Sequence, residues 1–485
     1  MIHLYRLILI GEFADLYAQL AEGGRWVSDQ WWYTLAHVCQ RWRNLVLGSA
    51  SYLDLCLVCT FGMPVADMLA HSPPLPLIID YFVPSPPLPR NCPVDDGDIS
   101  RITAEEKGII FALKQRDRIR RVRLRVPASN LQKLVEVIDE EYPILEYLIL
   151  SPLAHDGTTF ELPERLQAPH LHHLVLINFA IPIGYRLLTT ATSLATFWLV
   201  VRSPSTYFPP NFLLQWISSM PQLETLVIDF LPPELSTVED DEESQHKEAR
   251  ITLPNLRRFE FTGGNAYLEA LVCRFIAPCL EKFKLFFPWR RTFSIPGLVR
   301  FMNTTENLTF DSAKFVFTRK LVYVEFYLSA EAETKTNSFF MCIYCGYFES
   351  PLPSVAQIFN SLGQRFSMVE HLALEYKSRG RLIDYRDEAC AEWRGLLRSF
   401  SNVKTLRIDY GLVEAFSRCL RLRDEEQPLW LLPNLQLFTY FGSTNADDVA
   451  LNSFVDARRI AGSPITLIDA TVFQDLRPRS FISQD

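Results

Sequence analysis

The sequence predicts an α/β fold, in which a small helical segment precedes an irregular array of strand–helix repeats stacked into a solenoid. Three observations predict it. An apolar pattern recurs every 23–34 residues, helical apolar spacing fills the segments between recurrences, and the 485 residues exceed one ordinary domain core. A unit of this size cannot bury its own apolar face, so neighbouring units must pack on one another.

Composition and charge exclude several classes of protein. Hydrophobic residues make up 48% and charged residues 21%, which is typical of a globular chain and not of collagen, a charged disordered chain or a heptad fibre. The net charge of −8 gives no general attraction for nucleic acid or an anionic membrane. We find no apolar run of about 18 residues and no convincing signal peptide, so we expect no membrane span and a cytoplasmic or nuclear location. The ten cysteines then read as buried thiols.

The chain divides into four predicted segments. Residues 1–50 form a helical segment, and residues 51–100 form a proline-rich connector with a first strand at Leu77–Phe82. Residues 101–470 hold the repeats, and residues 471–485 form a tail.

The repeat has an apolar residue, two spacers, an apolar residue, one spacer and a third apolar residue. An 89-residue gap between Leu280 and Val369 has room for two more repeats whose phase the sequence does not fix. The ten clear copies are Ile119/Val122/Leu124, Leu145/Leu148/Leu150, Leu171/Leu174/Leu176, Leu194/Phe197/Leu199, Leu223/Leu226/Ile228, Leu256/Phe259/Phe261, Leu280/Phe283/Leu285, Val369/Leu372/Leu374, Val403/Leu406/Ile408 and Leu435/Phe438/Tyr440.

The segments between these copies have helical spacing, with apolar residues at i, i+3, i+4 and i+7 over residues 131–138, 268–275, 355–362 and 393–400. A strand and a helix at this period resemble leucine-rich repeats of the long, irregular type. That family places an Asn or Cys three residues after the third apolar position, and its side chain ties neighbouring repeats together. Here those positions hold Phe179, Leu231 and Gly264, so we expect another kind of tie.

The spacer residues of the repeat form a candidate target-binding surface. Side chains alternate along a strand, so the spacers face the side opposite the apolar core, which in a solenoid is the concave side. Mixed charge with aromatics suits recognition of a protein, although an ordinary solvated sheet face is the alternative. The predicted target-binding residues are Arg121, Arg123, Arg125, Tyr147, His173, Trp198, Arg258, Lys282, Lys284 and Arg407, and the row also contains Asp229, Glu260, His371, Glu375 and Asp409.

Residues 31–46 carry the most specific signal, because they predict one amphipathic helix that buries a single stripe in a core or an interface. The pattern Leu35-x-x-Val38-Cys39-x-x-Trp42-Arg43-x-Leu45-Val46 resembles the second half of an F-box. The sequel, with Leu53-Asp-Leu, Val58-Cys-Thr, Pro64 and Leu75-Pro-Leu, is similar to a large family of fungal F-box proteins with leucine-rich-repeat-like C-terminal regions.

The resemblance implies a non-catalytic substrate-recognition subunit of an SCF ubiquitin ligase. Its F-box would dock on the Skp-type adaptor of the cullin-RING complex, and its repeats would bind an unknown target protein. The implied adaptor-binding residues are Leu35, Val38, Cys39, Trp42, Arg43, Leu45 and Val46. One departure is clear: F-boxes usually open with Leu-Pro-x-Glu, whereas this chain has Leu4–Phe13 without proline. Residues 7–16 are then a divergent first helix, or the true start is missing.

Two alternatives remain beside this hypothesis. The first is a repeat scaffold that binds protein but has lost the adaptor contact. The second is an enzyme, but the sequence contains no glycine-rich phosphate loop, no nucleophile elbow and no HExxH motif.

We find no motif that indicates a cofactor, a metal site or binding of nucleic acid, and two weak candidates are set aside. The pairs Cys56/Cys59 and Cys342/Cys345 lie in alternating apolar contexts that oppose zinc chelation. The arginine cluster 116–125 lacks the interleaved aromatics of an RNA-binding surface and sits in an acidic chain.

Overall fold

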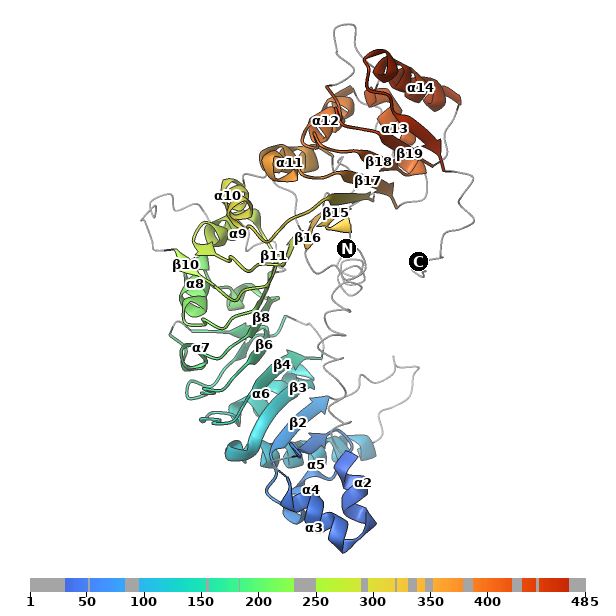
Figure 1. Cartoon of the computed structure of the whole chain (residues 1–485). Helices are drawn as coiled ribbons and strands as arrows, with labels where there is room; N and C mark the ends of the chain where they lie inside the picture. Colours follow the sequence, from blue (N-terminus) through green and yellow to red (C-terminus); the bar gives the residue numbers. More distant parts are fainter. Residues whose placement is uncertain are drawn as a thin grey trace. The chain divides into compact units, whose positions relative to one another are not determined.

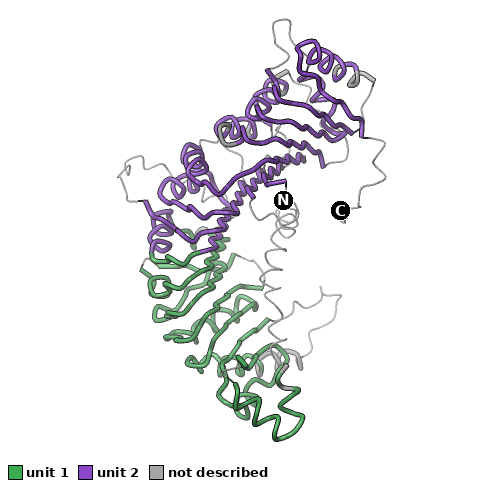
Figure 2. Tube along the Cα trace, viewed as in Figure 1, with its two compact units in different colours: residues 1–208, 219–223 green, residues 209–218, 224–485 purple. Residues whose placement is uncertain are grey.

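The computed structural model shows a mixed α/β chain with a large, mostly parallel β-sheet (Figure 1). It divides into two compact units (Figure 2): unit 1 is Met1–Phe208 with Ser219–Leu223, and unit 2 is Pro209–Ser218 with Glu224–Asp485. The predicted α/β class is confirmed, and the solenoid remains a prediction. The structure describes residues 31–50, 53–82, 96–153, 157–182, 184–230, 250–288, 295–318, 321–329, 338–344, 352–377, 387–420, 430–441 and 445–470.

Unit 1 contains the two segments predicted as helical and connecting, together with the first repeats. Its elements are α2 (Trp31–Val38), α3 (Gln40–Gly48), β1 (Leu57–Thr60), α4 (Val65–His71), β2 (Leu77–Phe82), α5 (Asp96–Leu113), β3 (Ile119–Val126), α6 (Ala128–Glu136), β4 (Tyr147–Pro152), β5 (Phe160–Glu161), β6 (His173–Ile177), β7 (Phe179–Ala180), α7 (Arg186–Thr190) and β8 (Thr196–Val201).

Unit 2 contains the remaining repeats. Its elements are α8 (Pro210–Ser218), β9 (Thr225–Phe230), β10 (Ile251–Thr252), β11 (Arg258–Thr262), α9 (Asn265–Val272), β12 (Phe275–Ile276), β13 (Lys282–Phe287), α10 (Pro296–Thr304), β14 (Ser312–Phe317), β15 (Leu321–Tyr327), β16 (Ser338–Tyr344), α11 (Leu352–Phe366), β17 (His371–Tyr376), α12 (Asp387–Arg398), β18 (Thr405–Ile408), α13 (Tyr410–Leu420), β19 (Leu437–Tyr440), α14 (Asn445–Ile460) and β20 (Thr466–Asp469).

The sheet of unit 1 is parallel, in the order β1-β2-β3-β4-β6-β8. Its register aligns the middle apolar residue of each repeat, so that Val122, Leu148, Leu174 and Phe197 lie side by side and at most 1% exposed. Helix α6 packs on this buried face of β3 and β4 through its own apolar stripe. The recurring pattern therefore marks the strands and their pairing.

The segment before β3 is more structured than the predicted connector. Strand β2 matches the predicted strand at Leu77–Phe82, which is confirmed. A second strand, β1, pairs with it in parallel, and helices α4 and α5 pack on each other over the same part of unit 1. The predicted strand between the prolines is β2, and the elements that were not predicted, β1 and α4, both precede the proline run that begins at Pro73.

The sheet of unit 2 has the order β9-β11-β13-β16-β15-β14-β17-β18-β19-β20. Three strands, β14, β15 and β16, fill the 89-residue gap in the repeat. Strand β15 is antiparallel to both neighbours, whereas β16 pairs in parallel with β13 and β14 in parallel with β17. The three strands thus enter the sheet in reverse order, which two regular repeats do not do.

Main-chain carbonyls at the strand entrances replace the expected side-chain tie between repeats. The carbonyl of Glu146 accepts the N–H groups of His172 and His173 at 2.8 and 3.0 Å. In unit 2 the carbonyl of Glu370 accepts from Lys404 and Thr405 at 2.8 and 3.0 Å. One carbonyl with two lone pairs can satisfy two donors, so each strand entrance is fixed to the next without an asparagine.

Asn178 joins two neighbouring repeats, although it lies one position before the one at which the family pattern places an asparagine. Asn178 is fully buried, and its Oδ1 accepts the N–H of Arg202 at 2.6 Å. Its own N–H donates to the carbonyl of Val200, and its φ of 64° lies in the left-handed region that asparagine tolerates. It follows Leu176 by two residues instead of the three that the family pattern places there.

Across the described part of the chain, no helix is long and apolar enough to cross a membrane.

Candidate functional site

The predicted helix over residues 31–46 is two helices, α2 and α3, with a break at Cys39. The backbone there is extended, with φ −161° and ψ 169°, and the Cys39 thiol accepts the N–H of Trp42 at 3.5 Å as an N-cap of α3. A single helix was therefore the wrong prediction, because a capping side chain in mid-sequence starts a second helix. Cys39 is exposed, and not on a buried stripe.

An apolar patch lies exposed on this helix pair, and we call Val38, Trp42 and Leu45 the α2–α3 patch. Their side chains are 61%, 46% and 61% exposed. Leu35 of the predicted set is half-buried. Three large apolar side chains exposed on two adjoining helices are typical of a surface that binds a partner.

The remaining predicted adaptor-binding residues support the helix pair from inside. Val46 is only 2% exposed, so its prediction as a contact residue needs correction. The Arg43 guanidinium donates to the carbonyl of Ala36 at 3.1 Å and to Oε1 of Gln40 at 3.3 Å, which braces α3 against α2. Trp32, which is not in the predicted adaptor-binding set, is buried and donates through Nε1 to the carbonyl of Cys56 at 3.3 Å.

The second candidate surface is the sheet face opposite α6, which we call the far face. In unit 1 it carries a column of three residues aligned across β3, β4 and β6. The Arg121 guanidinium lies 4.7 Å from the centroid of the Tyr147 ring, and that ring stacks on His173 at 4.3 Å. Cation–π and π-stacking contacts hold the column together. All three residues belong to the predicted target-binding set.

Two further arginines of β3 pair with β2. Nε and Nη2 of Arg123 bind the two carboxylate oxygens of Asp80 at 2.6 and 2.5 Å, and Arg125 lies 5.4 Å from the Phe82 ring centroid. Asp80 is only 5% exposed. The alternation within the predicted strand Leu77–Phe82 places both β2 residues on the face of the arginines, and that signal was available in the sequence.

The His173 imidazole in this column is neutral at pH 7. Burial lowers its pKa to about 4, and the positive charges of His172 and Arg121 act in the same direction against the opposing charge of Glu146. The pKa of His173 is lower in the folded chain than in the unfolded chain, so the neutral imidazole stabilises the folded state. This contribution to the free energy of unfolding is present above about pH 6.5 and is lost as the pH falls toward 4.

Trp198 does not belong to the exposed surface. It was predicted as a target-binding residue, but its side chain is 3% exposed, and Asp229 of the same row is 1% exposed. The burial pattern of β8 shows why: all residues from Phe197 to Val201 are buried, so strand alternation no longer separates a buried from an exposed face.

In unit 2 the predicted target-binding residues form ion pairs and ring contacts on one sheet face, which we call the far face of unit 2. The carboxylate of Glu260 binds Arg258 at 2.7 Å and Lys284 at 3.4 Å, and the Arg407 guanidinium lies 4.7 Å from the Phe441 ring centroid. Lys282 is half-buried on the same strand as Lys284. The predicted cations of unit 2 thus lie on one sheet face, together with carboxylate and aromatic neighbours.

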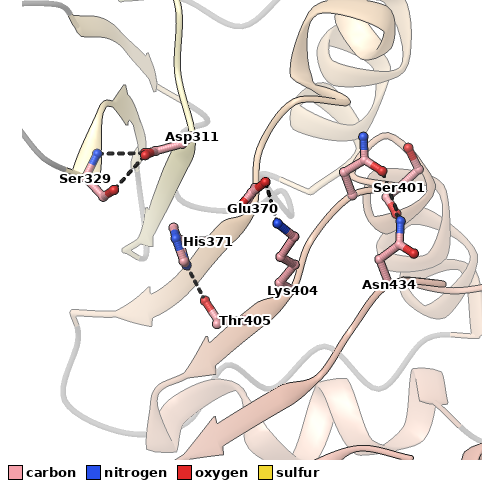
Figure 3. A network of polar contacts seen from close by, with 9 residues as sticks. Asp311, Ser329, Glu370, His371, Ser401, Lys404, Thr405 and Asn434 are labelled. Carbon is pink, nitrogen blue, oxygen red and sulfur yellow. Dashed lines mark hydrogen bonds and ion pairs between the residues drawn. The ribbon is translucent and has the colours of Figure 1, made fainter. Parts of the chain in front are cut away.

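A polar network joins the strand entrances of unit 2 (Figure 3). Glu370 and Lys404 form an ion pair at 2.6 Å, and the His371 ring is hydrogen-bonded to the Thr405 hydroxyl at 2.8 Å. Asp311 accepts from Ser329, and although burial raises its pKa, hydrogen bonds from Ser329 and Ser312 outweigh that effect and lower it. Each contact joins neighbouring elements, so the network is structural.

Within the described ranges, no group of three or more His, Cys, Asp or Glu side chains is placed to hold a metal ion. Cys56, Cys59 and Cys342 are buried free thiols, whereas Cys345 lies outside the described residues.

Comparison with known proteins gives no relative: no protein-family model matches the chain, and no curated protein matches it.

Proposed function

We propose that the protein is a non-catalytic substrate-recognition subunit of an SCF-type ubiquitin ligase, which docks the Skp-type adaptor through the α2–α3 patch. The observation that carries the proposal is the exposure of Val38, Trp42 and Leu45 on a helix pair whose sequence resembles the second half of an F-box. The divergent first helix expected over residues 7–16 lies outside the described residues.

The physics of the patch suits docking onto a helical partner. Trp is among the residues that most often dominate binding energy, and burial of apolar area stabilises a complex by about 25 cal/mol per Å². Arg43 and Trp32 hold the two helices in place, so the patch is preorganised and loses little conformational entropy on binding.

The far face supplies the target-binding half of the proposal. In unit 1 it combines the Arg121–Tyr147–His173 column with Arg125 over Phe82. Aromatic and arginine side chains held by their own neighbours are typical of the energetic centres of protein interfaces. In the complex, this subunit would bring its target close to the ubiquitin carrier, and the chemistry would belong to the partner subunits.

The Trp42→Asp substitution tests the adaptor contact. It places a charge in the α2–α3 patch, and we expect the affinity for a purified Skp-type adaptor to fall about 100-fold or more, because an unpaired charge would be desolvated on binding. Titration calorimetry with the full chain measures the change.

The matched control is Arg41→Ala, an exposed position on the same helix outside the patch, which should leave the affinity within about twofold. Adaptor binding that survives Trp42→Asp, or the lack of any binding by the folded wild-type chain, contradicts the proposal.

The alternative is a protein-binding scaffold that does not bind the adaptor. The burial of Val46 and the internal bonds of Arg43 favour it, because they remove two predicted contact residues from the docking surface. In that case a target captured by the far face is retained by both the wild-type chain and Trp42→Asp, while the adaptor binds neither.

A further inference from the structure

Two cysteines of unit 2, Cys390 and Cys419, have no role in the proposed function, and their thiols lie next to each other. Cys390 belongs to the first turn of α12 and Cys419 to the last turn of α13, and their side chains are hydrogen-bonded to each other. The Cys419 thiol also donates to the carbonyl of Ala415 at 3.0 Å. Both cysteines are free in this structure.

The surrounding contacts fix this approach of the two helices. One turn after Cys390, the buried Arg394 donates through Nε to the carbonyl of Cys419 itself at 2.9 Å. Trp393 packs edge-on against Phe416 at 6.0 Å between the same helices. Two neighbouring residues of α12 therefore hold this helix against α13 one turn after Cys390.

We propose that Cys390 and Cys419 are a thiol oxidation site, which closes into a reversible disulfide between α12 and α13 when hydrogen peroxide is the oxidant. The Cys390 thiolate attacks the peroxide, an S–O bond forms, the O–O bond breaks, and water leaves after protonation. The Cys419 sulfur then attacks the sulfenic acid of Cys390, an S–S bond forms, and a second water leaves. Two thiols lose two electrons in total, and the peroxide is reduced.

The two sulfurs have different roles because their surroundings differ. Cys390 is half-buried, whereas Cys419 is 1% exposed. Burial, with the neighbouring Cys390 thiol, raises the pKa of Cys419 well above its usual value. Cys390 is thus the sulfur that the peroxide reaches first, and Cys419 is the resolving sulfur.

The disulfide would close a loop from residue 390 to residue 419, which contains strand β18. Such a loop restricts local opening of α12 and α13. Oxidation would then rigidify this part of unit 2, and a dithiol reductant would release it. The inference does not depend on adaptor docking, since the α2–α3 patch lies in unit 1.

The test is peroxide treatment of the full chain, followed by alkylation, proteolysis without reductant and mass spectrometry. We expect one cross-linked peptide pair joining Cys390 to Cys419, lost on treatment with dithiothreitol and absent in Cys390→Ser. Amide exchange of α12 and α13 should slow about tenfold or more in the oxidised chain and return after reduction.

The exposed Cys39, at the N-cap of α3, is the internal control and should be trapped by dimedone as a sulfenic acid without a partner. The proposal is overturned if Cys390 proceeds to a sulfinic acid while Cys419 stays free, or if both remain reduced while Cys39 reacts. Cys390→Ser keeps the test valid even if a variant at the buried Cys419 fails to fold.

Discussion

Phe326→Ala is expected to destabilise the protein by about 3–5 kcal/mol, the cost of removing a fully buried phenylalanine. Phe326 lies on β15, 0% exposed, and stacks on Phe366 at 4.1 Å between ring centroids. Its ring also lies 5.6 Å from Phe359 and 5.8 Å from Phe339. The antiparallel strand thus places one ring at the centre of an aromatic cluster in unit 2, and alanine would leave a large cavity there.

The measurement is urea denaturation of the full chain with amide exchange of β15 as a local reading. Phe340→Ala is the matched control, because Phe340 lies half-buried on the adjacent strand β16, and its loss should cost about 1 kcal/mol. Equal effects of the two substitutions would contradict the placement of β15 that the structure shows.

Asp80→Ala is expected to cost about 2–4 kcal/mol, since it leaves the Arg123 guanidinium largely buried without the carboxylate that binds it through two hydrogen bonds. The side chains of the pair are only 7% and 18% exposed, so solvent does little to compensate the lost partner. The same variant should also weaken target binding, because Arg123 lies on the strand of Arg121 and Arg125.

The control for this pair is the double substitution Asp80→Leu with Arg123→Leu. Replacing both charges by apolar side chains of similar size is often neutral, so the double variant should be more stable than Asp80→Ala. Thermal unfolding of the three proteins measures the difference. A double variant that is as unstable as the single one would show that the ion pair does not carry the effect.

The regular part of the fold was predictable because the repeat couples strand position to pairing. Each copy of the apolar pattern falls on a parallel strand, and the register brings Leu372, Leu406 and Phe438 side by side. The predicted helices over residues 131–138 and 355–362 correspond to α6 and α11. Period and spacing are local signals, and here tertiary packing agrees with them.

The irregular parts depend on contacts that the pattern does not encode. Antiparallel β15 carries alternating apolar residues like any strand, and its direction follows from the short connection to β14 across Thr318. The break at Cys39 depends on one capping bond, and helical spacing continues through it.

The candidate surfaces were predictable to a similar degree. Alternation placed Arg121, Tyr147 and His173 on one face, as the structure shows. It failed at Trp198, because β8 is buried on both faces and alternation carries no information in such a strand. The N-terminal set divides into exposed Trp42 and buried Val46, and a helical stripe alone does not predict that division.

Hydrogen–deuterium exchange of the full chain, with and without the Skp-type adaptor, tests the central claim most directly. Docking through the α2–α3 patch predicts slower exchange in residues 31–48 on adaptor addition, with no slowing in the Trp42→Asp chain. Unchanged exchange in α2 and α3 at saturating adaptor, or protection confined to the repeats, would contradict the account.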